Sequence, residues 1–133
     1  MRFRFRHLLG TKASLEIDPA GGDNAVTYTA RRPGTSGNKI QIAYNAAGSG
    51  TDGAFSISGK VITVTILDGT TSADDVVSEF ANAPQAVKNL LGTPTASEGD
   101  GTGAIPFSSL GAANLTGGEN LGPRRRYSER TKR

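Results

Sequence analysis

Apolar and polar residues alternate along much of the first half of the chain, as in β-strands that bury one face. Three segments show this alternation, and each is followed by a cluster of turn-forming residues: 13–17, 25–31 and 39–44. We therefore predict three strands in these segments. The side chains expected to face the core from the second and third strands are Val26, Tyr28, Ala30, Ile40, Ile42 and Tyr44.

The strongest local signal is a hairpin over residues 54–67. Gly59 and Lys60 separate two alternating runs, and glycine in the first position of a two-residue loop is typical of a type II′ turn. Closing the turn there pairs Ser58 with Val61 and gathers five apolar side chains on one face: Phe55, Ile57, Ile62, Val64 and Ile66. A slip of one residue would mix this face with polar residues, so the pattern predicts the register as well as the strands.

Residues 72–91 change to a helical period. Ser72 and Asp75 form a candidate capping box, and residues 73–82 are predicted to form a helix that Pro84 ends. A second helical piece is expected over 84–91. Short strands are expected around residues 93–97 and 104–107, and Leu110 and Leu115 are expected to pack back on the sheet. The predicted fold class is α+β: a mostly antiparallel β-sheet or sandwich with one helix or a broken helical pair packed on one face.

The composition narrows the possible chemistry. A chain of 133 residues fits one domain, and its 18 glycines favour turns and short strands over long helices. There is no cysteine, which excludes disulfides, thiolate metal sites and thiol catalysis. His7 is the only histidine, so a multi-histidine zinc site is excluded as well.

No segment has the signature of a catalytic or cofactor site. The glycine-rich segment 98–104 lacks the Lys-Ser/Thr ending of a phosphate-binding loop. The acidic residues lie mostly at turns, where aspartate makes local hydrogen bonds. The longest strongly apolar segment, Val61 to Leu67, is far shorter than a membrane span. We therefore expect a protein that is not an enzyme, with no catalytic residues, no metal site, no cofactor and no membrane partner.

Charge is strongly segregated along the chain. Residues 1–12 contain four basic and no acidic residues, and residues 124–133 contain six basic residues and one acidic residue. Residues 13–123 contain five basic and eleven acidic residues. The sequence thus predicts a basic N-terminal arm (1–12), a β-rich globular domain (13–121) that is acidic on average, and a basic C-terminal arm (122–133). Such arms usually bind an anionic partner.

The N-terminal arm has a period of two, with Met1, Phe3 and Phe5 alternating with arginines. This pattern predicts an extended segment that docks by strand addition or along a groove. In the C-terminal arm, three adjacent arginines can bind carboxylates bidentately. The candidate partner-binding residues are Arg2, Phe3, Arg4, Phe5, Arg6, Arg124, Arg125, Arg126, Arg130, Lys132 and Arg133. Nucleic acid is an alternative partner. The remaining alternative is that the two arms are solvated tails that bind no partner.

Five segments in order carry a resemblance to a known kind of protein: AVTYTARRPGTSGNKIQIAY (25–44), FSISGKVITVTILDG (55–69), TSADDVVSEFANAPQAVKNLL (71–91), GDGTGA (99–104) and LGAANLTGG (110–118). Together they resemble a small β-rich module that recurs in structural proteins of tailed bacteriophages. The resemblance covers roughly residues 25–118 and rests on structural motifs. The basic arms lie outside it.

The resemblance, the arms and the missing catalytic signature lead to one favoured interpretation. It is a virion structural protein, a capsid decoration or cement protein that stabilises the assembled shell through its domain and arms. The expected partner is the major capsid protein or another virion protein, and we expect a homo-oligomer, of which a trimer is one form, on the particle. The expected location is the capsid surface, with assembly in the host cytoplasm. The alternatives are a tail or head–tail connector component and a surface-binding or adhesion module.

Overall fold

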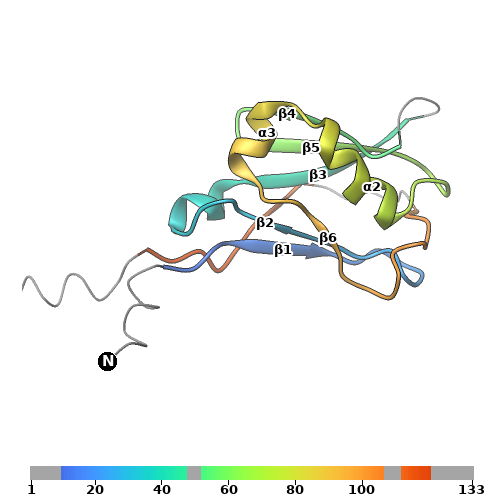
Figure 1. The fold of residues 1–133 in the computed structure, drawn as a ribbon, viewed down its shortest axis with the longest axis horizontal. Coiled ribbons are helices and arrows are strands. Elements are labelled where there is room, and N and C mark those ends of the chain that lie inside the picture. The colour runs from blue at the N-terminus through green and yellow to red at the C-terminus, as the bar shows by residue number, and fades with distance from the viewer. Residues whose placement is uncertain (1–9, 48–51, 107–111, 121–133) are drawn as a thin grey trace, which may run out of the picture.

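Two β-sheets and a set of short helices form the part of the chain that the computed structural model describes, residues 10–47, 52–106 and 112–120 (Figure 1). The first sheet contains, in order, β1 (Ser14–Ile17), β2 (Val26–Thr29) and β6 (Thr95–Ala96). The second contains, in order, β4 (Ala54–Ser58), β5 (Val61–Leu67), β3 (Gln41–Ala47) and β7 (Ala113–Asn114). The helices are η1 (Thr35–Lys39), α2 (Ala73–Glu79), η2 (Phe80–Asn82) and α3 (Gln85–Leu90). The predicted α+β class is confirmed, and the residues of both predicted arms lie almost wholly outside the described ranges.

The core lies where the two sheets and the helices meet. Every side chain predicted to face inward from the second and third strands is buried, and α2 contacts both β4 and β6, so it spans the two sheets. Phe80 closes this layer with a T-shaped contact to Phe55, the ring centroids lying 5.4 Å apart. The alternation in the sequence therefore identified the buried faces correctly.

The hairpin has the predicted register. Ser58 pairs with Val61 and Phe55 with Val64 in an antiparallel ladder between β4 and β5. Gly59 has φ +62° while Lys60 does not enter the left-handed region, as a type II′ turn requires. Of the five apolar side chains on the inner face, four are buried and Ile57 is half-buried against the core.

A Val64→Ala variant is expected to lower the free energy of unfolding by about 1–3 kcal/mol. Val64 is fully buried at the centre of the hairpin's inner face, so the removed methyl groups leave a cavity that the two sheets cannot readily close. Urea denaturation followed by circular dichroism measures the loss. The exposed Ser56→Ala change on the opposite face is the control and should shift the midpoint little. Equal effects of the two changes would show that the register is wrong.

The pairing of β3 with β5 is the exception to an otherwise antiparallel arrangement. These two strands run parallel over their whole length, from Gln41 opposite Val61 to Ala47 opposite Leu67. The parallel register puts Ile42 beside Ile62 on the buried face. Strand alternation fixes which face each strand buries, but it does not say which strands become neighbours, so the sequence did not predict this pair.

Residues 72–91 form helices as predicted, but the helical segment is interrupted after Glu79. Ser72 accepts a hydrogen bond from the Asp75 backbone N–H (3.1 Å), and the Asp75 carboxylate accepts one from the Ser72 N–H (3.0 Å), which confirms the capping box. The α-helix ends at Glu79 and tightens into η2, and Pro84 then caps α3. Of the two predicted later strands, the first is reduced to the two residues of β6. The described part of the second lies in a loop over residues 97–106, whose Ala104 makes an isolated bridge to Ser72. Leu115 is buried as predicted, while residues 107 and 110 lie outside the described ranges.

One polar contact joins the two sheets inside the core. The hydroxyls of Tyr28 on β2 and Tyr44 on β3 lie 2.6 Å apart, and their rings meet edge to face. Burial raises the pKa of both phenols above the ordinary value near 10. The pair therefore stays neutral and hydrogen-bonded at physiological pH.

Candidate functional site

The two ends of the described chain are joined side by side. Thr11 and Glu119 exchange two backbone hydrogen bonds (2.9 and 3.0 Å), and Ser14 and Thr116 exchange two more (2.8 and 2.9 Å). We call residues 11–14 together with 116–119 the terminal ladder. Because of it, the N-terminal and C-terminal arms both begin at the same end of the domain (Figure 1).

The segment that contains η1 holds the terminal ladder in place. The Gly34 N–H donates to the Thr11 carbonyl (3.0 Å). The Asn38 side chain binds Gly118 twice, donating to its carbonyl (3.1 Å) and accepting from its N–H (2.8 Å). The Asn120 carboxamide oxygen accepts from the Thr35 N–H (3.0 Å). These contacts order the chain up to the residues from which the arms start.

The predicted partner-binding residues themselves, in residues 2–6 and 124–133, lie outside the described residues. What the structure adds is the surface from which the arms begin. All six lysine and arginine residues within the described ranges lie at this same end of the domain: Lys12, Arg31, Arg32, Lys39, Lys60 and Lys88. We call this surface the cationic end.

Backbone contacts bring these distant positions together. The Arg31 N–H donates to the Leu90 carbonyl (2.8 Å), and the Arg31 guanidinium donates to the Lys88 carbonyl (3.2 Å), so the end of β2 meets α3. The Lys60 carbonyl accepts from the Gln41 N–H (2.9 Å), which places the hairpin turn beside the end of η1. The cationic end is therefore built from the strand ends of both sheets.

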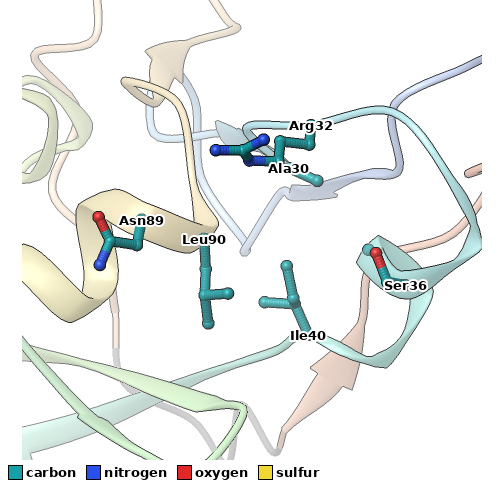
Figure 2. A pocket seen from close by; sticks show the side chains of 7 residues that line it. Ala30, Arg32, Ser36, Ile40, Asn89 and Leu90 are labelled. Carbon is teal, nitrogen blue, oxygen red and sulfur yellow. The ribbon is translucent and has the colours of Figure 1, made fainter.

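Most of these cations face solvent. Five of the six are exposed, and Lys88 is half-buried. The Lys88 ammonium donates to the Ala81 carbonyl (2.6 Å). Figure 2 shows Arg32 above a small pocket that is lined by Ala30, Ile40 and Leu90 together with Ser36 and Asn89. Its lining is mainly apolar with one cation.

The opposite end of the domain carries most of the acidic residues. Eight of the eleven carboxylates in the described ranges lie there: Asp18, Asp23, Asp52, Asp68, Asp74, Asp75, Glu98 and Asp100. We call this surface the acidic end. The Gly103 N–H donates to the Asp23 carbonyl (2.9 Å) and the Asp74 N–H donates to the Gly101 carbonyl (2.8 Å), so the turns after β1, β5 and β6 meet.

Several of the carboxylates at the acidic end stabilise local structure. The Thr71 hydroxyl donates to Asp52 (2.8 Å), and Asp75 caps α2. The hydroxyl and N–H of Thr102 both donate to Asp100 and lower the pKa of that carboxyl, so it is charged at neutral pH. Within the described ranges, no group of three or more His, Cys, Asp or Glu residues could hold a metal ion.

The charge pattern refines the expectation of an acidic domain with basic arms. The net charge of residues 13–123 is negative, but the fold places the basic and the acidic residues at opposite ends of the domain. A signal for this was present in the sequence, because successive turns alternate in sign: acidic at 18–23, basic at 31–39, acidic at 52, basic at 60 and acidic at 68. Strands that run back and forth place alternate turns at opposite ends of a domain.

Comparison with family models, with curated proteins and with solved structures found no match to this chain. Among the helices in the described ranges, none is long and apolar enough to cross a membrane. The site is therefore interpreted from its own residues. An array of guanidinium and ammonium groups on a rigid surface, continued by two basic arms, is suited to binding an extended anionic surface.

Proposed function

We propose that the protein is a structural protein of a bacteriophage virion, a capsid decoration or cement protein that stabilises the assembled shell. The observation that carries the proposal is the common origin of the two arms. Both begin at the terminal ladder, and the six cations of the described domain lie at the same end of the domain. The described cations and the starting points of both arms therefore lie at one end of the domain.

The energetics favour an assembled partner over a free subunit. An exposed ion pair contributes only about 0–1 kcal/mol, so one arm on one subunit binds weakly. Two arms that leave one point can reach adjacent subunits of a lattice, and linking the contacts raises the effective concentration of each. A cement protein needs this behaviour, because it should bind the mature shell and leave unassembled subunits free. The resemblance over residues 25–118 agrees with this role.

Removing either arm is expected to lower occupancy on assembled shells while the domain stays folded. The test compares the full chain with a chain that ends at Gly122 and with one that lacks residues 2–6. Binding to purified shells is measured across a salt series, because raising salt from physiological strength to about 1 M shortens the screening length from about 8 Å to about 3 Å. We expect the full chain to bind best and to lose binding as salt rises.

A matched control separates charge from geometry. Changing Arg124, Arg125 and Arg126 to lysine keeps the charge but removes the planar fork that binds carboxylates bidentately. The lysine variant should bind less well than the full chain and better than the truncated one. Equal, salt-insensitive binding by all variants would show that the arms are solvated tails that do not contribute to binding. Binding to free DNA but not to emptied shells would identify nucleic acid, rather than a shell protein, as the partner.

A further inference from the structure

We propose that copies of this chain associate head to tail, with the cationic end of one domain docked against the acidic end of the next. The inference goes beyond the role on the shell and does not depend on it. It rests on the charge distribution of the described domain, in which every lysine and arginine lies at one end and eight of eleven carboxylates lie at the other.

The two ends are too far apart to neutralise each other within one copy. The seven-residue strands β3 and β5 run from one end of the domain toward the other, and seven residues of strand span about 20 Å. The screening length at physiological salt is about 8 Å. Exposed charges at the two ends, such as Arg32 and Lys60 at one and Asp18 and Asp74 at the other, therefore face solvent, and the two ends of successive copies complement each other.

A second copy fits the cationic end better than nucleic acid does. The described aromatic residues, Tyr28, Tyr44, Phe55 and Phe80, are all buried, so they offer no platform on which bases could stack. Exposed carboxylates such as Asp18 and Asp74, in contrast, are the groups that Arg32 and Lys60 bind well.

Contact between two different ends generates a closed or an open assembly. A head-to-tail interface forms a ring when the rotation between copies closes, and a filament when it does not. A ring of copies would provide the homo-oligomer that the sequence led us to expect. The arms begin at the cationic end, which docks on the next copy in this proposal. The arms of each copy would therefore begin beside its neighbour.

Charge-reversal variants of the full chain test the interface without a shell. The basic-end variant is Arg32→Glu/Lys60→Glu, and the acidic-end variant is Asp18→Lys/Asp74→Lys. All four side chains are exposed. Sedimentation velocity over a concentration series should show salt-sensitive self-association of the unchanged chain. Each variant alone should associate about tenfold or more weakly, and an equal mixture of the two should regain association.

The control variant is Glu16→Lys/Glu79→Lys, which makes the same change in net charge as the acidic-end variant at two carboxylates that are not among the eight of the acidic end. It should associate like the unchanged chain. The proposal is overturned if the unchanged chain is monomeric at low salt, if the control loses association equally, or if mixing the variants restores nothing. It is also overturned if the basic-end change weakens binding to duplex DNA while self-association is absent. Shell binding is measured separately, so the two proposals can fail independently.

Discussion

A Gly118→Ala variant is expected to lose about 3 kcal/mol or more of unfolding free energy, at the upper end of what overpacking usually produces. Gly118 is buried in the terminal ladder. A Cβ atom there would collide with the Gly34 carbonyl oxygen and would lie 3.0 Å from the Asn38 side-chain oxygen and 3.2 Å from the Ala13 Cβ. The first of these is a backbone atom, so a rotamer change cannot relieve the collision. Urea denaturation measures the loss.

The matched control is Gly22→Ala. Gly22 is exposed, has no heavy atom within 4 Å of the added Cβ and needs no left-handed backbone. It should change the unfolding free energy by less than about 0.5 kcal/mol. Hydrogen exchange adds a local measurement, because the Thr11 and Glu119 amides should lose protection in Gly118→Ala before the hairpin amides do. Equal protection in the two variants would mean that Gly118 does not hold the origin of the arms together.

Alkaline pH is expected to destabilise the protein through the buried Tyr28–Tyr44 pair. Burial raises the pKa of both phenols in the folded state, while the unfolded chain ionises near the ordinary value of about 10. The stability that this difference supplies is therefore fully present below pH 10 and is lost as the pH rises above it. Each tyrosine that stays protonated in the folded state lowers the unfolding free energy by about 1.4 kcal/mol per pH unit there.

The double variant Tyr28→Phe/Tyr44→Phe separates this effect from the titration of surface lysines. Removing both hydroxyls leaves neither one unpaired in the core, so stability at pH 7 should change by no more than about 1–2 kcal/mol. Its unfolding free energy should fall less steeply above pH 10 than that of the unchanged chain. Unfolding curves in urea between pH 8 and pH 12 give both slopes. If the unfolding free energy of both proteins falls equally steeply with pH, the tyrosine pair does not cause the loss of stability above pH 10.

Local patterns in the sequence were sufficient for the elements that depend on neighbouring residues. The hairpin register follows from the Gly59-Lys60 turn and the period of two, and the start of α2 follows from the capping box of Ser72 and Asp75. The short β6 strand and the loop after it were predicted less well. Their conformation depends on contacts with the turn at Asp23 and with Ser72, which lie far away in the sequence.

The sequence by itself determined the basic charge of residues 1–12 and 124–133, the faces that the strands bury and the net acidic charge of residues 13–123. The tertiary structure alone decided that β3 lies parallel to β5, that residues 11 and 119 lie side by side and that the charges of the domain are sorted to its ends. The physical reason is the range of the interactions. Alternation and turn chemistry act between residues a few positions apart, whereas strand neighbours and charged surfaces arise from contacts between segments that are far apart in the sequence, as residues 11 and 119 are.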